Sequence, residues 1–379
     1  MQAQQGAPVD PDALKAGIEG MRDVDTILFG AAVDVDKERV YVENRFAMVP
    51  ESAAAGMYGA MAKATSTIAI PATADGKPAA VRGHVAMAIP EALRGLVKDT
   101  VVQALPVSDK VEWSDGNGSG SSETVVFEPA NTVFKLLRQV IPAMVDAGGV
   151  DAALAIDTSA AEMAEGKAMP AVTVGMKVKD GAALEADLKT LLGAKNALPG
   201  GVVVKFDTGK AGDANLHTVE VDLAGDDGEM RRVLGAKVPM TLAVSPARAV
   251  LLVGGDMAKR AAGGTANADA KPLAGLDVSL APLVAYAAGT QKIVAPDDAD
   301  GLALATAANE EASALPSSLV QVLVRPIERG MATRLSADAG AIKLLKSLVM
   351  LRQPAAQPAG FGPGPVPKGR AIPVPGLAP

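Results

Sequence analysis

Apolar positions near the start of the chain alternate with polar ones or form short runs, a pattern typical of β-strands. Segments 26–35 and 39–49 lie on either side of the charged triplet Asp36-Lys37-Glu38, and together they predict a β-hairpin. Segments 67–70 and 80–89 predict a second hairpin in the same way. The N-terminal part therefore reads as strands that are paired locally.

Helices are predicted directly after strands. Pro-Glu pairs at Pro50 and Pro90 each begin a helical segment, because proline fits the first helical turn and an acid suits the positive end of the helix. Strand 172–178 is followed by a helix that Asp180 caps and Gly193 ends. The leucines that share one face of this helix are Leu184, Leu188, Leu191 and Leu192. The recurrence favours degenerate strand-strand-helix units without a regular period.

These elements predict an α+β fold, in which amphipathic helices pack on one face of a mainly antiparallel, twisted sheet. We expect two lobes with a boundary near Gly148-Gly149. The expected divisions are a disordered N-terminus (1–11), a first α+β lobe (12–148), a second α+β lobe (149–352) and a disordered Pro/Gly-rich tail (353–379).

The amino-acid composition narrows the range of functions to be expected. Hydrophobic residues make up 49% of the 379 residues and aromatic residues only 3%, with 2 His and no Cys. Few side chains are thus suited to general-base, metal, thiol or stacking chemistry, so we expect no enzymatic activity, no metal and no cofactor. The net charge of −7 disfavours nucleic acid and anionic membranes as partners.

The mean hydropathy of +0.22 raises the question of a membrane span. The best candidate is 238–255, but Pro239, Pro246 and Arg248 divide it into two short apolar runs, whereas a span needs about 20 mainly apolar residues. We expect two strands and no transmembrane segment. The first twelve residues show no basic or apolar signal region, and their Gln/Pro-rich character resembles what remains after signal cleavage.

The two histidines are the obvious candidates for chemistry. His217 shares a strand face with Val219 and Val221, which predicts a partly buried, hydrogen-bonded side chain, because no Cys or second nearby His could complete a metal site. His84 is predicted to be exposed. The loop beginning at Asp115 matches the first half of a calcium loop, but Val126 stands where the bidentate Glu belongs, so a flexible loop is favoured over calcium.

Methionines supply the remaining candidate site. Met57 and Met61 are four residues apart on an Ala-rich predicted helix. Together with Leu96 and Val97, on the helix after the second hairpin, they form a candidate lining for an apolar ligand. The alternative, which we favour, is that they fill a core that is short of aromatic residues.

The order of features over 172–346 resembles a group of Ala-rich exported bacterial proteins of unknown function. The segments AVTVGMKVKDGAALEADLKTLL, VVVKFDTG, NLHTVEV and VPMTLAVSPARAVLLVGGD carry the resemblance. It implies an exported protein of the periplasm or cell envelope and the α+β architecture, but no activity. We therefore expect a non-catalytic structural or interaction protein with a protein partner. The alternative is a carrier of a lipid or other apolar ligand between sheet and helices; the oligomeric state stays open.

Overall fold

The described part of the chain folds around one sheet. The computed structural model describes residues 22–63, 68, 79–91, 94–95, 98–99, 142, 144–146, 148–158, 168–193, 201–223, 228–254 and 273–352. The strands are β1 (Val24–Asp34), β2 (Arg39–Met48), β3 (Val81–Ala88), β4 (Gly149–Asp157), β5 (Ala171–Lys177), β6 (Val202–Ala211), β7 (Ala214–Asp222), β8 (Lys237–Ser245), β9 (Arg248–Val253), β10 (Ala274–Ser279), β11 (Leu319–Ile327) and β12 (Gly330–Asp338). The helices are α2 (Ala53–Met61), α5 (Gly181–Gly193), α6 (Glu229–Leu234), α8 (Leu280–Val294), α9 (Ala299–Ser313) and α10 (Ala339–Arg352).

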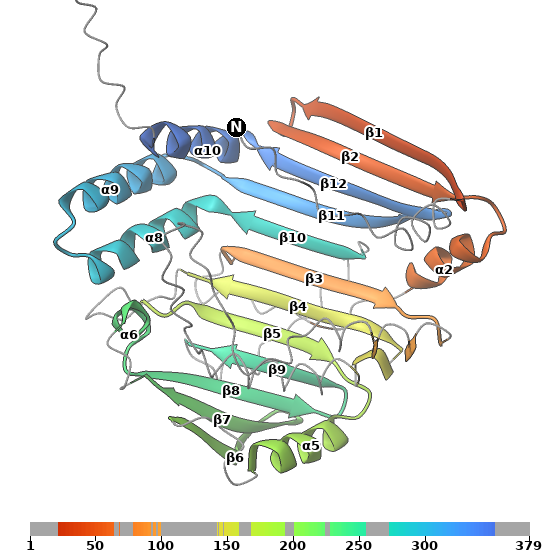
Figure 1. The fold of residues 1–379 in the computed structure, drawn as a ribbon, viewed down its shortest axis with the longest axis horizontal. Coiled ribbons are helices and arrows are strands. Elements are labelled where there is room, and N and C mark those ends of the chain that lie inside the picture. Colours follow the sequence, from red (N-terminus) through yellow and green to blue (C-terminus); the bar gives the residue numbers. More distant parts are fainter. Residues whose placement is uncertain are drawn as a thin grey trace, which may run out of the picture.

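The twelve strands form an open sheet in the order β1-β2-β12-β11-β10-β3-β4-β5-β9-β8-β7-β6 (Figure 1). Every neighbouring pair is antiparallel. The α+β class and the mainly antiparallel sheet are therefore confirmed. The predicted hairpin at 26–49 is β1–β2, and segment 238–255 contains β8 and β9, joined at Pro246.

The second predicted hairpin is wrong in its pairing. Strand β3 has β10 on one side and β4 on the other, so both of its edges are occupied by strands from distant parts of the chain. The last three strands, β10 to β12, lie between β2 and β3. Local alternation cannot reveal such an insertion, because it identifies a strand but not its neighbours.

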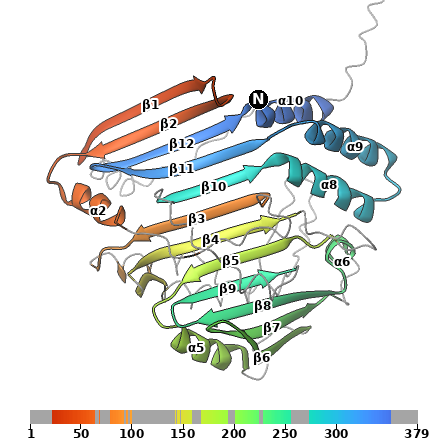
Figure 2. The same cartoon turned by 180° about the vertical axis from the view of Figure 1, so that it is seen from behind.

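The described helices gather at the two ends of the strands. In Figures 1 and 2, α6, α8, α9 and α10 lie toward one end, and α2 and α5 lie toward the other. Aspartates begin three of them: Asp180 accepts from the Ala183 N–H at 3.0 Å, Asp298 from the Gly301 N–H at 2.9 Å, and Asp338 from the Ala341 N–H at 2.7 Å. The predicted Asp180 cap is confirmed.

The two faces of the sheet differ in chemistry. One face, here called the apolar face, carries a row of residues in register from β1 to β7: Ala31, Val42, Leu335, Val322, Leu276, Gly83, Leu154, Val174, Leu251, Leu242 and His217. The next row, on the opposite or polar face, is Ala32, Tyr41, Ser336, Gln321, Asp277, Arg82, Ala155, Thr173, Leu252, Thr241 and Thr218. Strand alternation thus separates aliphatic from mostly polar and small side chains.

Helix α5 covers part of the apolar face and forms a core there. Leu184 and Leu188 are buried, as the leucine stripe predicts, and they cluster with Val178, Ala249 and Met144. The partly buried residues against this cluster include Val150 and Met176. Because aromatic residues make up only 3% of the chain, the burial of aliphatic side chains such as these has to supply most of the hydrophobic stabilisation.

The two-lobe division at Gly148-Gly149 stays a prediction. Strands from both sides of that boundary belong to the one sheet, and β3 and β4 pair directly across it. The predicted disordered ends, 1–11 and 353–379, and the loop at Asp115 lie outside the described residues.

Replacing Leu188 with aspartate should unfold or severely destabilise this part of the sheet. Leu188 is 3% exposed, so the carboxylate would be buried among aliphatic side chains without a partner, at a cost of several kcal/mol. Thermal melting and urea unfolding measure the loss. Asp187→Ala, on the exposed side of the same helix, is the matched control and should change stability by less than about 0.5 kcal/mol. Wild-type melting of Leu188→Asp would contradict this packing.

Candidate functional site

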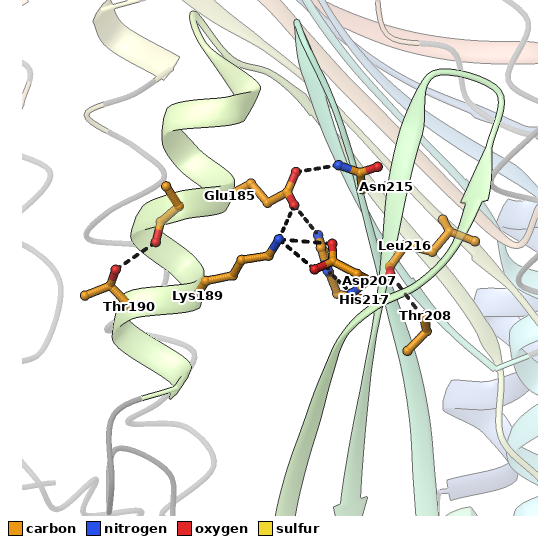
Figure 3. A network of polar contacts seen from close by, with 9 residues as sticks. Glu185, Lys189, Thr190, Asp207, Thr208, Asn215, Leu216 and His217 are labelled. Carbon is orange, nitrogen blue, oxygen red and sulfur yellow. Dashed lines mark hydrogen bonds and ion pairs between the residues drawn. The ribbon is translucent and has the colours of Figure 1, made fainter.

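A cluster of titratable side chains that includes a buried histidine lies where α5 crosses β6 and β7 (Figure 3). Glu185 and Lys189 are one turn apart on α5, Asp207 is on β6, and Asn215 and His217 are on β7. We call these five residues the α5 network. It is assembled from α5 and β7, which the sequence predicts, and from β6; the approach of the three elements was not predicted.

His217 is the buried centre of the α5 network. Its side chain is 2% exposed, and Nδ1 accepts a hydrogen bond from the backbone N–H of Asp207 at 3.1 Å. In the neutral ring the proton must then be on Nε2. Nε2 points to Glu185 Oε1 at 3.6 Å and has no hydrogen-bond partner, and the Phe206 ring lies edge-on at 5.6 Å.

The backbone at Asp207 makes this contact. Asp207 has φ of 54°, in the left-handed region, and the β6–β7 register shifts between Lys205 and Gly209. A non-glycine residue adopts this conformation only when its surroundings compensate for the strain. Here the Asp207 N–H reaches His217 while the carboxylate of the same residue reaches Lys189.

Lys189 joins the two carboxylates. Its Nζ lies 2.7 Å from Glu185 Oε1 and donates to both Asp207 oxygens, at 3.0 and 2.9 Å. Asn215 Nδ2 donates to the other Glu185 oxygen at 2.9 Å. Burial raises the pKa of Glu185, but the hydrogen bonds from Lys189 and Asn215 outweigh it, and the net pKa is lowered. The hydrogen bond from Lys189 likewise lowers the pKa of Asp207.

Burial also sets the charge of His217. It lowers the pKa of the imidazole from its usual 6.5, and the nearby carboxylates of Glu185 and Asp207 oppose this only in part. His217 is therefore neutral at pH 7. The α5 network at that pH contains two carboxylates, one ammonium and a neutral ring.

Glu185, Asp207 and His217 place three ligand atoms within 4.8 Å of one another, which is close enough to hold a metal ion. Two observations oppose a metal. Coordination through Nε2 would move the ring proton to Nδ1, where it would meet the Asp207 N–H as a second donor. The Lys189 ammonium also lies between the two carboxylates. The cluster fits a salt-bridge network that holds α5 to the sheet better than a metal centre.

The sequence predicts the environment of His217 but not the other members of the α5 network. His217 was predicted to be partly buried and hydrogen-bonded; the hydrogen bond is confirmed and the burial is more complete than predicted, but Glu185 and Asp207 were missed as its neighbours. The available signal was the i, i+4 spacing of Glu185 and Lys189, which is common on helix surfaces and names no third partner.

The prediction for His84 is wrong. The side chain is half-buried, because its ring lies over Gly275, where a Cβ would be 2.5 Å from His84 Cε1. His84 and His217 do not meet: they lie on opposite faces, and β4, β5, β9 and β8 separate their strands.

The predicted apolar lining stays a prediction. Met57 and Met61 are half-buried on α2, and the Tyr58 ring contacts Phe46 on the apolar face at 5.3 Å. Leu96 and Val97 lie outside the described residues. A separate apolar groove of about 630 Å³ lies between α8, α9 and α10. Its lining is Val284, Ala287, Ala288, Gln291, Gly301, Leu304, Ala305, Ala308, Leu345, Leu348 and Val349.

Stability should fall as the pH drops below about 6.5, because the unfolded histidine takes up a proton there while folded His217, with its lowered pKa, resists. The slope should reach at most about 1.4 kcal/mol per pH unit and end below the pKa of the folded state. Urea unfolding between pH 7.5 and 5 measures it. His217→Gln should flatten the curve above about pH 6, where the lowered pKa values of Glu185 and Asp207 contribute little. An unchanged slope in that range would show that His217 is not its source.

Replacing Lys189 with methionine should raise the pKa of His217, because the ammonium disfavours protonation of the ring. With only 2 histidines in the chain, NMR titration resolves each ring, and His217→Gln assigns the signals. Lys237→Met, which removes the ion-pair partner of Glu220, is the control and should leave the pKa of His217 as in the wild type. A lowered or unchanged value in Lys189→Met would contradict the α5 network as described.

Comparison of the chain with protein-family models, curated proteins and solved structures finds no match. The resemblance to Ala-rich exported bacterial proteins consequently stays a prediction. Any function has to be inferred from the geometry and chemistry of this chain itself.

Proposed function

We propose that the chain is a non-catalytic structural or interaction protein of the bacterial cell envelope, and that the outer part of the apolar face is its binding surface. One observation carries the proposal: large aliphatic and aromatic side chains on four strands of this face are between 38% and 76% exposed. They are Ile27, Phe29 and Val33 on β1, Val40 and Val42 on β2, Leu335 on β12 and Leu276 on β10. We call these seven residues the apolar patch.

Charge is confined to the other face of the same strands. Over β1, β2, β12, β11 and β10, the positions in register with the apolar patch hold no charged residue among those described, and only Asn44 and Thr333 are polar. On the polar face, Glu43 pairs with both Arg45 and Arg334, and Arg82 pairs with Asp277 at 3.0 Å. Solvent is therefore expected on the polar face and a partner on the apolar one.

An exposed apolar patch has a cost that a partner removes. Each Å² of apolar surface withdrawn from water is worth roughly 25 cal/mol. Contiguous patches of more than a few hundred Å² are rare on monomers and mark interaction surfaces. Helix α2 contacts this face at Phe46, toward one end of the strands, and the residues of the apolar patch remain exposed beside it.

The absence of catalysis and the location are part of the proposal. The α5 network is closed by its own ion pairs, which supports a structural role. None of the described helices has both the length and the apolar character needed to cross a bilayer. Export and an envelope location rest on the sequence resemblance, and the net charge of −7 supports partners other than nucleic acid.

We also propose that the fold is built from related strand-strand-helix units with helices packed on one face of the sheet. Chain order supplies the sequences β1-β2-α2, β4-β5-α5, β6-β7-α6 and β11-β12-α10, which support related strand-strand-helix units. The contacts of α2 with Phe46 and of α5 with Ala249 support helices packed on the apolar face.

A second candidate function is carriage of an apolar ligand. The groove between α8, α9 and α10 favours it, because about 630 Å³ lies within the range of small-molecule sites, roughly 300–1,000 Å³. Leu304, Leu345 and Val349 line the groove and are 39%, 47% and 59% exposed. The ligand would be a lipid or similar molecule, since Gln291 is the one side chain of the lining with a polar group.

The two functions are separated by titration with the uncharged apolar dye Nile red and with palmitate, followed by fluorescence. If the apolar patch is the binding surface, the dye should bind and Val42→Lys should weaken it at least about tenfold, because a charge would enter the apolar patch. Val203→Lys is the matched control: Val203 is 48% exposed, against 54% for Val42, and lies on the polar face of β6.

A different outcome would favour the carrier. Saturable micromolar palmitate binding that Val42→Lys leaves intact, and that Leu345→Lys abolishes without unfolding, would place the ligand in the helical groove. Loss of that binding in Met61→Trp instead would place it at the predicted methionine lining. Either result would overturn the apolar patch as the binding surface.

A further inference from the structure

Strand β1 is apolar on both faces and, among the residues that the structure describes, pairs on one edge only. Ile27, Phe29 and Val33 belong to the apolar patch, and Leu28, on the polar face, is 56% exposed. From Thr26 to Asp34 the strand pairs with β2, and no described residue pairs with its other edge. The segment 26–33 contains no charge and no proline. Such an edge is a ready template for another strand.

The opposite edge of the sheet is protected. Strand β6 has the register shift between Lys205 and Gly209, and it carries Lys205, Asp207 and Lys210. Bulges and charges of this kind prevent edge-to-edge pairing. The sheet formed by the described strands thus has one blocked edge and one open edge, and the open edge is also the more apolar.

The exposed side chains and backbone groups of β1 indicate what kind of partner fits this edge. A lipid or a stacked sheet would cover Phe29 but would leave Leu28 and the outer backbone groups of β1 in water. An added strand covers both faces and pairs these N–H and C=O groups at the same time. An added strand therefore fits this edge better than a lipid or a stacked sheet.

We propose that this strand is β1 of a second copy, so that two sheets join edge to edge as a two-fold homodimer. A two-fold axis at Gly30 makes β1 self-complementary in the antiparallel direction. Phe29 then lies opposite Ala31 of the second copy, Leu28 opposite Ala32, and Ile27 opposite Val33. In the first two pairs a large side chain meets a small one, and in the third two β-branched side chains meet. Gly30 is unobstructed, with no atom within 4 Å of a Cβ built there.

The same register keeps like charges apart. Asp34 lies opposite Thr26 of the second copy, and Asp25 lies opposite Val35. Each acid is already neutralised within its own chain: Asp34 by Lys37 at 3.4 Å, and Asp25 by Arg329 at 3.4 Å. Directly opposed like charges would destabilise a strand pair, and this arrangement has none. The apolar faces of the two copies become one continuous surface.

Disulfide trapping tests the register, because the natural chain has no cysteine. Directly opposed residues have Cα atoms about 4.5–5.5 Å apart, within the range for a disulfide. Gly30→Cys should give a covalent dimer on mild oxidation. Val33→Cys alone should not, but a mixture of Val33→Cys and Ile27→Cys chains should. Trapping of Val33→Cys alone, with Gly30→Cys remaining monomeric, would overturn the two-fold at Gly30.

Sedimentation equilibrium tests the dimer itself. Wild type should sediment at twice the chain mass at micromolar concentration, and Phe29→Lys at the mass of one chain with an unchanged circular dichroism spectrum. Val203→Lys, at the β6 edge, should remain dimeric, as should Val42→Lys, which tests the apolar patch separately. A single-chain mass for wild type, or a dimer that Phe29→Lys leaves intact, would overturn the proposal.

Discussion

Pairing between the two ends of the chain holds the sheet together. Strand β12 lies against β2 from Gly330↔Ala47 to Asp338↔Arg39, and through it the N-terminal hairpin joins the remaining strands. A two-stranded hairpin alone is marginally stable in water. The carboxylate of Asp338 reinforces this junction, because it accepts from the Leu319 N–H at 2.8 Å on β11 and from the Ala341 N–H at 2.7 Å on α10. The surface that we propose for binding therefore exists only once the last strands are in place.

The separation of the two faces follows from the same ladder. In this register, apolar residues of β12 lie beside apolar residues of β2, and polar residues lie beside polar ones. Because successive side chains of a strand point to opposite faces, a one-residue slip of β12 would place Arg334 on the apolar face where Leu335 now lies. Arg334 is held on the polar face by Glu43 and by the Tyr41 ring, 4.3 Å from its guanidinium carbon. Polar contacts on one face thus fix the register that gathers the apolar patch on the other.

The α5 network shows how a chain poor in chemically versatile side chains uses those it has. The one histidine on the apolar face is enclosed under α5. Its Nδ1 accepts a hydrogen bond from the backbone N–H of Asp207, whose φ of 54° lies in the left-handed region. The ammonium of Lys189, on the solvent side of the cluster, forms ion pairs with the carboxylates of both Glu185 and Asp207. Helix α5 is consequently held to β6 by the Lys189–Asp207 ion pair, to β7 by the hydrogen bond of Asn215 with Glu185, and to β9 by its leucines.

The sequence by itself determined the α+β class, the β1–β2 and β8–β9 hairpins, the Asp180 cap, the leucine face of α5 and the partly buried face on which His217 lies, because periodicity and capping are local. Only the tertiary structure decided that β10 to β12 enter between β2 and β3, that His84 is covered across Gly275, and that Glu185 and Asp207 meet His217. These contacts join residues distant in the chain, and alternation fixes a side chain's face without naming the strand beside it. The exposed apolar patch belongs to the second group, since exposure depends on what else packs against a face.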